Sequence, residues 1–344
     1  MTGRINRRKV LVTGGTGFIG SALVRGLLAA GATVRSFDND SRGAASKLGD
    51  ARNDVELIVG DIRDAAAVRE AVRGMDTVCH LAYINGTEYF YSHPELILEV
   101  ATKGMMNVLD SCVAEGVRDL VLTSSSEVYQ GPPTIPTDEQ VPLVVPDVLN
   151  PRFSYGGGKI ISELLTVNYG RKYFDHTLIC RPHNVYGPDM GREHVIPQFI
   201  LRLYECAARQ PKGVIDFPIQ GTGEETRAFM YIDDFTRALI RVMEQGERLG
   251  IYHVGTDREV SVGALAQMIA AACGRTIRIV PGELLAGSTP RRCPDVTKLK
   301  GLGFVPAVSL EQGLTRTAEW YGAHCSVRQA PRSGLDCISE TTSS

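Results

Sequence analysis

The sequence lacks a Cys-x-x-Cys motif, a long apolar run and an excess of charge of one sign. Its eight cysteines are spaced like neither a zinc site nor a disulfide framework, so we expect no metal and reduced thiols in a cytoplasmic protein. The apolar stretch 22–30 is interrupted by Arg25 and is far too short to span a bilayer. The basic start of the chain leads directly into the apolar run 10–12, which indicates no signal peptide.

The charges are balanced. Lys and Arg total 37 and Asp and Glu total 39, giving a net charge of −2, which argues against nucleic acid or an anionic membrane as a partner. Hydrophobic residues make up 43% and charged residues 22% of the 344 residues, so the chain can bury a sizeable core. Glycine is abundant, with 36 residues, and predicts tight turns and close backbone approaches.

Short β-like runs alternate with longer helix-like runs in the first half of the chain. The β-like runs are 9–13, 33–37, 55–59, 77–81, 120–123 and 177–180, and the main helical runs are 18–30, 65–73, 94–115 and 155–173. This alternation predicts right-handed βαβ units and a doubly wound parallel α/β sheet covered on both faces. After Arg181 the pattern changes to helices near 197–209, 233–245, 260–273 and 310–321, with a hairpin-like stretch at 219–226.

A glycine-rich turn separates the first strand from the first helix. It holds a Gly-x-Gly-x-x-Gly pattern at Gly15, Gly17 and Gly20, preceded by Gly14. Such glycines let a pyrophosphate approach bare backbone N–H groups at the positive end of a helix, and the strand before and helix after support that interpretation. We expect this turn to bind a dinucleotide through Gly14, Gly17, Phe18, Ile19 and Gly20.

Two acidic residues end the next two strands. Asp38, followed by Asn39, is placed to accept hydrogen bonds from the ribose hydroxyls and to repel a 2′-phosphate, which favours NAD over NADP, although nearby Arg42 could soften that preference. Asp61, followed by Ile62, is placed either to meet the adenine or to cap the next helix.

Tyr155 and Lys159 lie one helical turn apart and therefore point to the same side of their helix. A phenol has an ordinary pKa near ~10, and a neighbouring ammonium together with a cationic nicotinamide ring would lower it toward neutrality. The run 123–127, at the end of the preceding strand, adds hydroxyls and a carboxylate to the same region.

These motifs, in this order, resemble the extended short-chain dehydrogenases/reductases, specifically the nucleotide-sugar epimerase/dehydratase family. The resemblance covers roughly residues 8–321 and is carried by 13–20, Asp38, Asp61, 80–82, 124–129, Tyr155, Lys159, 181–188, 226–234, 291–295 and 302–304. Beyond it, the Arg-, Ser- and Thr-rich end of the chain has little periodicity and predicts a flexible tail over 326–344. The resemblance implies a Rossmann NAD-binding domain over 1–181 with returning segments near 228–255, and an interleaved mixed α/β nucleotide-sugar lobe over 182–325. It also implies a homodimer formed through the helices 94–115 and 155–173.

The resemblance also implies roles for individual residues. Tyr155 matches the catalytic base and Lys159 its partner, which also holds the nicotinamide ribose, while Ser125 matches the group that hydrogen-bonds the reacting sugar hydroxyl. Leu81 and Ala82 match cofactor-binding positions. The expected substrate-binding residues are Ser125, Ser126, Tyr83, His183, Asn184, Val195, Arg227 and Arg292, of which the two arginines and Asn184 match groups near the diphosphate.

Several positions depart from the family's usual pattern. Three glycines, 156–158, precede Lys159 where Ser is common just before the lysine, and Ala101 stands at a usual Asn. Tyr83 replaces a small residue and His183 an apolar one. Tyr83 and His183 either reshape the sugar pocket or, for His183, simply pack in the core.

The expected reaction begins with oxidation of the sugar at C4. Return of hydride to the other face gives 4-epimerisation, which we expect, because dehydratases carry an Asp where this chain has Ser126. Glu127 leaves decarboxylation of a nucleotide-linked uronic acid as the alternative, with Arg152 or Arg192 as a cation for the sugar carboxylate, or else Glu127 is structural. A 4,6-dehydratase of the same family, a non-catalytic NAD-binding scaffold and a net reductase are further alternatives. The intact Tyr155, Lys159 and Ser125 argue against the scaffold.

Overall fold

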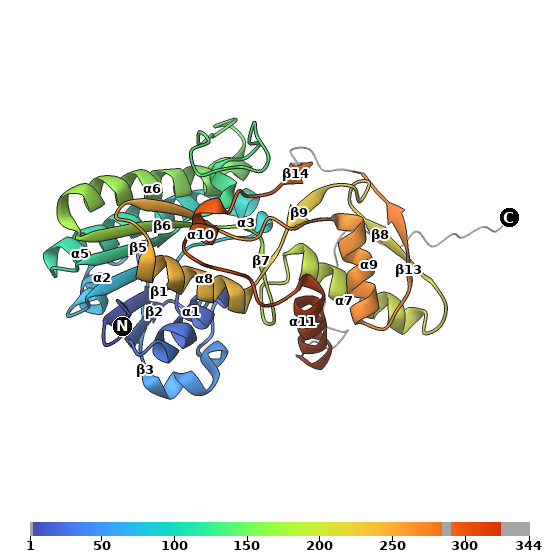
Figure 1. Cartoon of the computed structure of the whole chain (residues 1–344), viewed down its shortest axis with the longest axis horizontal. Coiled ribbons are helices and arrows are strands. Elements are labelled where there is room, and N and C mark those ends of the chain that lie inside the picture. The colour runs from blue at the N-terminus through green and yellow to red at the C-terminus, as the bar shows by residue number, and fades with distance from the viewer. Residues whose placement is uncertain (1–2, 284–289, 325–344) are drawn as a thin grey trace.

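A seven-stranded parallel sheet forms the larger part of the molecule, in a computed structural model that describes residues 3–283 and 290–324 (Figure 1). The strand order is β11-β6-β5-β4-β1-β2-β3. The strands are β1 (Lys9–Thr13), β2 (Thr33–Asp38), β3 (Val55–Val59), β4 (Thr77–His80), β5 (Asp119–Thr123), β6 (His176–Pro182) and β11 (Gly250–Val254). The predicted doubly wound sheet is confirmed, whereas the expected tail over 326–344 lies outside the described residues.

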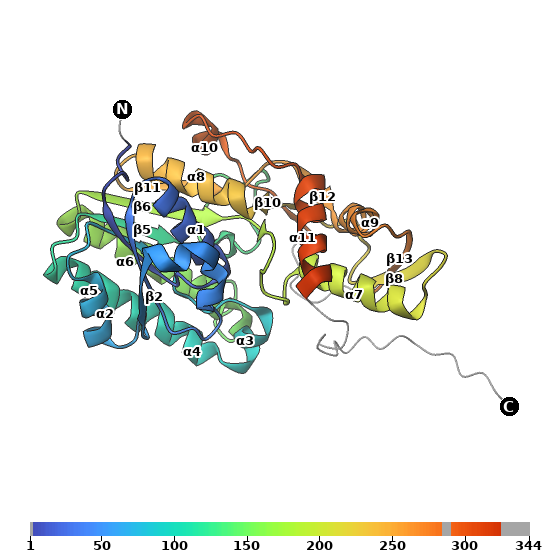
Figure 2. The same ribbon diagram turned by 90° about the horizontal axis from the view of Figure 1, so that it is seen from below.

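Both faces of the sheet are covered by helices, which explains why its strands are apolar throughout rather than alternating. Val10 and Val12 of β1 pack toward α1 (Phe18–Ala29) and α8 (Ile232–Gln245) on one face. Leu11 packs on the other face with α2 (Ala65–Val72) and α5 (Met105–Ala114), beside which lies α6 (Ser154–Tyr173) (Figure 2). The predicted helix 94–115 is observed as α4 (Pro94–Glu99), a π turn η2 (Val100–Gly104) and α5.

A smaller lobe follows the sixth strand and lies beyond one end of the sheet (Figure 1). Its helices are α7 (Val195–Arg209), α9 (Val262–Ala272) and α11 (Leu310–His324). The predicted hairpin at 219–226 is wrong: β8 (Ile215–Ile219) pairs in parallel with β13 (Ile277–Pro281), while β9 (Thr226–Ala228) pairs with β12 (Glu259–Ser261) and β14 (Arg291–Arg292). The two sides of this glycine turn therefore belong to different sheets.

The chain crosses between the two parts more than once. Helix α8 and strand β11 return to the large sheet, where β11 pairs in parallel with β6, and α10 (Thr297–Gly301) packs against β11. The short pair β7 (Val185–Tyr186) and β10 (Met230–Tyr231) lies where the chain passes between the two parts. The remaining short elements are α3 (Thr87–Ser92) and the 3-10 helices η1 (Ala45–Asp54), η3 (Ser126–Val128) and η4 (Pro151–Phe153).

This topology fixes where a ligand can bind. β1 lies between β2 and β4, so the connections leaving β1 and β4 diverge, and a crevice opens outside their carboxyl ends. The small lobe lies beyond the same end of the sheet (Figure 1). Within residues 3–283 and 290–324, no helix has the length and apolarity needed to cross a membrane.

Candidate active site

A cavity of about 760 Å³ lies at the carboxyl ends of the central strands. Its walls come from the loops after β1, β2, β4 and β5, from the start of α6, from segment 189–194 and from two arginines of the small lobe. Of the residues predicted to form the site, the cavity is lined by Gly14, Gly17, Phe18, Ile19, Gly20, Asp38, Asn39, Asp61, Ile62, Leu81, Ala82, Tyr83, Ser125, Ser126, Glu127, Tyr155, Lys159, Asn184, Arg227 and Arg292. His183 and Val195 are not in its lining.

The glycine turn forms a bare backbone cradle at one end of the cavity. Gly14 has φ +74°, and a Cβ there would lie 2.8 Å from the backbone nitrogen of Ala82. A Cβ on Gly20 would overlap the carbonyl oxygen of Gly14. Helix α1 begins after Gly17, and no side chain caps it. The first backbone N–H groups of the helix therefore stay available at this end of the cavity. The cradle fits a dinucleotide pyrophosphate, since any side chain here would fill it.

Asp38 is fixed at the end of β2 by backbone donors. Its carboxylate accepts hydrogen bonds from the N–H groups of Thr16 and Asp40, each at 3.0 Å. The guanidinium of nearby Arg42 is engaged elsewhere, 3.3 Å from Glu193 and 5.4 Å from the ring centre of Tyr89. The geometry therefore agrees with a carboxylate presented to a ribose.

Asp61 does not cap the following helix. The cap of α2 is Asp64, whose side chain accepts the N–H groups of Ala66 and Ala67. Asp61 pairs with Arg63 at 2.8 Å and accepts the Asn39 amide at 3.1 Å, and the Arg63 hydrogen bond chiefly lowers the pKa of Asp61 to about 2. The capping alternative is wrong, and Asp61 stays a cavity residue for the cofactor end.

Tyr155, at the first turn of α6, is buried among aromatic rings. Phe90 stacks on it at 5.2 Å between ring centres, and Tyr83 meets it edge-on at the same distance. Burial raises the pKa of Tyr155 to about 12, and a hydrogen bond with Ser125 opposes that shift only in part. The expected lowering of this pKa is therefore not produced by the side chains of the site alone, because desolvation of the phenolate outweighs them.

Lys159 lies one turn further along α6 and is almost fully buried. Its ammonium donates to the carbonyl of Thr123 at 2.8 Å and lies 6.0 Å from the centre of the Tyr155 ring. Burial lowers its pKa to about 7, although the charge of Glu163 acts in the opposite direction. The structure thus brings Tyr155, Lys159 and Ser125 together in one cavity, as the sequence spacing predicted.

The other end of the cavity is rich in guanidinium groups. Arg227 on β9 and Arg292 on β14 are register partners of two paired strands, although 65 positions separate them (292 − 227). Arg292 donates to Glu127 at 2.5 Å. Burial works to raise the pKa of Glu127, but the charges of Arg292, Arg152 and Arg227 outweigh it and hold this pKa below its usual value.

Asn184 turns the chain beside these arginines. It has φ +40°, a left-handed conformation in which asparagine is favoured, and its amide donates to the carbonyl of Ala228 at 2.9 Å. The pKa of Arg227 is lowered to about 10, first by burial and then by the charge of Arg292. Two adjacent guanidinium groups form a fitting site for an anion such as a diphosphate, whose charge and geometry they match.

Two predicted substrate residues lie outside this cavity. His183 is buried behind it and meets the His253 ring edge-on at 4.7 Å, so of the two open alternatives the packed histidine is the observed one. Val195 is the first residue of α7, and its neighbour His194 lines the cavity instead. Sequence reasoning also missed Lys47, Phe90, Asp189 and Glu193 as lining residues, because nothing in the local pattern places these loops.

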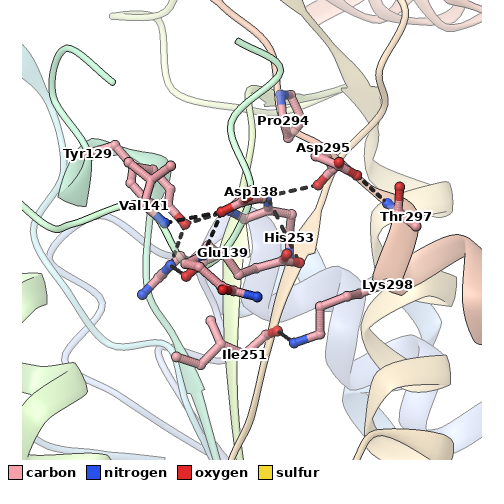
Figure 3. A network of polar contacts seen from close by, with 12 residues as sticks. Tyr129, Asp138, Glu139, Val141, Ile251, His253, Pro294, Asp295, Thr297 and Lys298 are labelled. Atoms are coloured by element: carbon pink, nitrogen blue, oxygen red, sulfur yellow. Dashed lines mark hydrogen bonds and ion pairs between the residues drawn. The ribbon is translucent and has the colours of Figure 1, made fainter. Parts of the chain in front are cut away.

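A buried polar network supports the site from below (Figure 3). The Tyr129 hydroxyl contacts His253 Nε2 at 2.6 Å, and His253 Nδ1 contacts the carbonyl of Asp295 at 2.9 Å. The backbone N–H of His253 donates to the Glu139 carboxylate at 2.9 Å. Arg181 joins this network, because it donates to Tyr129 and also pairs with Glu163 of α6 at 2.6 Å. The network therefore connects α6 to β11 and to the segment that carries Arg292.

The family model for the NAD dependent epimerase/dehydratase family matches residues 10–255. Together with the fold, the cradle and the Tyr155–Lys159 pair, this defines the class of the protein as an enzyme with a Rossmann sheet. The chain belongs to the NAD dependent epimerase/dehydratase family, as the sequence motifs indicated.

Relatives of this chain carry out different reactions. It is 32% identical to UDP-N-acetyl-alpha-D-glucosaminuronate decarboxylase of Bacillus cytotoxicus, over 92% of this chain and 98% of the relative. It is also 32% identical to dTDP-4-dehydro-6-deoxy-D-allose reductase of Streptomyces bikiniensis, over 92% and 97% of the two chains.

Solved structures agree with the observed fold. The dTDP-glucose 4,6-dehydratase of Streptomyces venezuelae, solved with NAD and TYD, is 30% identical, with a TM-score of 0.80 over 92% of this chain and 97% of that one. UDP-glucose 4-epimerase of Thermotoga maritima, solved with UDP-glucose, is 27% identical, with a TM-score of 0.80 over 92% and 99%.

Proposed function

We propose that this protein is an NAD-dependent nucleotide-sugar 4-epimerase. The observation that carries the proposal is the meeting of Tyr155, Ser125 and Lys159 in a single cavity with the glycine cradle at one end and two arginines at the other. Bound NAD would supply the hydride chemistry at C4 of the sugar that inversion requires. The cradle and Asp38 would hold this cofactor, and Lys159 would hold its nicotinamide ribose.

Tyr155 acts as the base that takes the proton from the C4 hydroxyl. Ser125, which hydrogen-bonds Tyr155, would contact the same hydroxyl and keep it in line with the phenol oxygen. The positive charge of Lys159 would favour the phenolate, and burial of the ammonium strengthens its field. After oxidation the sugar turns over in the cavity, and the protonated Tyr155 returns its proton to the C4 oxygen.

Arg227, Arg292 and Asn184 would hold the diphosphate while the sugar turns. Guanidinium groups suit phosphate oxygens in charge and in geometry, and an anchored diphosphate lets the sugar rotate without leaving the site. The proposal therefore requires a substrate with a nucleoside diphosphate rather than a free sugar.

Glu127 supports epimerisation over dehydration. A dehydratase needs a proton donor at this place, but the ion pair with Arg292 keeps the Glu127 carboxylate ionised, and its neighbour is Ser126 rather than an acid. Epimerisation of a neutral sugar at C4 requires neither a proton donor at position 127 nor an acid at position 126.

Decarboxylation of a nucleotide-linked uronic acid is the second candidate. It is favoured by the group of Arg152, Arg227 and Arg292 around Glu127, which could hold a sugar carboxylate, and by the decarboxylase among the 32%-identical relatives. The 4-keto uronate formed by the same first step would release carbon dioxide from C5 without a further oxidant.

The deciding experiment is incubation with a panel of neutral and uronic nucleotide sugars without added cofactor, followed by NMR and mass spectrometry. Inversion at C4 with unchanged mass is expected. Loss of carbon dioxide from uronates alone would establish the second candidate, loss of water would establish a dehydratase, and turnover only with added NADH would establish a reductase. Bound NAD without any turnover would indicate the non-catalytic scaffold.

We also propose that the protein is a cytoplasmic homodimer, with the nucleotide-binding unit over 1–181 and the interleaved substrate lobe over 182–325. Exposed apolar side chains on α4 and α6 support the dimer, among them Leu98, Ile161, Leu164 and Tyr173. Two such helices from each subunit would bury these side chains in a helix bundle. Analytical ultracentrifugation tests the association, and Leu164→Glu should yield monomers.

A further inference from the structure

Three departures from the family pattern meet at one point in the structure. A Cβ on Gly158 would overlap the Tyr83 hydroxyl and would lie 2.7 Å from the Cβ of Ala101. Gly158 lies inside α6 without a positive φ, so its backbone does not require glycine. Position 158 lacks a side chain because a Cβ there would overlap Tyr83, whose side chain fills the space beside Ala101 and Gly158.

The ring of Tyr83 also touches both groups that the proposed reaction uses. Its centre lies 3.8 Å from the Lys159 ammonium and 5.2 Å from the centre of the Tyr155 ring, to which it is nearly perpendicular with an interplanar angle of 85°. The Tyr83 hydroxyl has no hydrogen-bond partner among the described residues. Tyr83 therefore interacts with Lys159 and Tyr155 through its ring and not through its hydroxyl. The attraction between a cation and an aromatic face is strongest where water is excluded.

The Thr123 carbonyl accepts one N–H of the Lys159 ammonium at 2.8 Å, but the charged and titratable groups around Lys159 leave the support of its charge to the ring. Glu163 on α6 is its nearest carboxylate, but it is shared with Arg181 on β6 and with the Ser124 hydroxyl. His80 on β4 is neutral, since burial and then the Lys159 charge lower its pKa to about 3.

We propose that Tyr83 is a positioning residue whose ring face holds the Lys159 ammonium and whose perpendicular contact with the Tyr155 ring orients Tyr155, and that Gly158 and Ala101 are small in order to admit it. This inference rests on the proposed function for its catalytic meaning, but the contact itself can be tested without turnover.

The first test compares Tyr83→Phe with Tyr83→Leu by NMR of protein labelled with ¹³C at the lysine ε-carbon, with Lys159→Met assigning the signal. Wild type and Tyr83→Phe should share one Lys159 pKa and an upfield ring-current shift. In Tyr83→Leu that shift should vanish and the Lys159 pKa should fall by about one pH unit. An unchanged Lys159 signal in Tyr83→Leu overturns the proposal, whatever reaction the enzyme catalyses.

The same variants then link the contact to catalysis, once a substrate is known from the panel. Tyr83→Leu should lower kcat about tenfold, move the alkaline limb of the pH profile to lower pH and leave KM nearly constant. Tyr83→Phe should restore the wild-type profile. A normal pH profile in Tyr83→Leu despite the NMR change would mean that the proposed role of Lys159 is wrong, not the contact.

The second test uses the neighbouring glycines as a matched pair. Gly158→Ala should displace the Tyr83 ring, lower Tm and reproduce the Lys159 shift of Tyr83→Leu. Gly157→Ala is the control, because a Cβ there would meet only Val145 Cγ2 at 3.5 Å. In the double variant Tyr83→Ala, Gly158→Ala, the Tm loss caused by Gly158→Ala should shrink, because only the contact of the new Cβ with the Ala101 Cβ then remains. Equal stability of the two single glycine variants contradicts the proposal.

Discussion

The two ends of the cavity are built in different ways. The cofactor end is made by backbone that is continuous in the sequence, from Gly14 to Gly20, and its carboxylate Asp38 follows on the next strand. The proposed substrate end joins Glu127, Arg227 and Arg292, which come from three distant segments. The pairing of β9 with β14 brings the two arginines together, and Arg292 then donates to Glu127. A local motif therefore specifies the cofactor end, whereas long-range strand pairing specifies the substrate end.

The largest effect on turnover is expected at Tyr155, between the two ends of the cavity. Tyr155→Phe removes the base but keeps the buried ring, so turnover should fall by roughly 10²–10⁴-fold. Cofactor binding and Tm should stay close to wild type, as measured by NAD content after purification and by thermal unfolding. Substantial remaining activity would show that another group removes the C4 proton.

A sharper separation of the two ends comes from adjacent arginines. Arg292→Ala removes a charge-assisted contact to the diphosphate, worth about 1.5–3 kcal/mol, and should raise KM by roughly 10- to 100-fold while NAD binding is retained. The matched control is Arg291→Ala, because Arg291 pairs with Glu259 on the surface at 2.6 Å. If both variants changed KM alike, the loss would be one of strand pairing rather than of ligand contact.

The cofactor end should show the opposite pattern. Gly20→Ala places a methyl group against the Gly14 carbonyl, which costs about 1–3 kcal/mol of stability or distorts the cradle, and should lower NAD affinity. The control Gly301→Ala has open space around its Cβ and should leave both stability and NAD affinity unchanged. Isothermal titration with NAD and with the nucleoside diphosphate distinguishes the two ends, because only the first affinity should fall.

The smallest predicted effect is on stability and concerns His183, which is buried outside the cavity lining. Burial lowers its pKa well below the ordinary value, and neither ring nitrogen has a hydrogen-bond partner among the described residues. The unfolded chain takes up a proton below pH ~6.5 and the folded chain does not, so this residue makes stability fall as pH drops below that value.

His183→Leu should remove this contribution, flattening the loss of stability between neutral and acidic pH by up to about 1.4 kcal/mol per pH unit. Denaturant unfolding at several pH values measures it. His253→Leu is the comparison, since it breaks the contacts to Tyr129 and Asp295 and should destabilise the protein at every pH. A steeper acid dependence in His183→Leu would show that the histidine is protonated in the folded state.

Sequence reasoning succeeded where a residue's role depends on its immediate neighbours. The strands, the cradle and the Tyr155–Lys159 spacing follow from apolar runs, glycine positions and helical periodicity, and each is found where the pattern indicated. It failed for the hairpin at 219–226, and it could not tell that His183 and Val195 lie outside the cavity lining, because the environment of each is set by segments far away in the chain.

The sequence by itself determined the parallel sheet, the family and the cofactor end, because glycine at a strand-to-helix turn and apolar runs of fixed period act through local sterics and burial. Only the tertiary structure decided that Arg227 lies beside Arg292 and that the Glu127 carboxylate forms an ion pair with the Arg292 guanidinium. It also decided why Gly158 is a glycine: the phenol ring that needs its space is 75 positions away (158 − 83), and steric exclusion acts only between atoms that the fold has brought together.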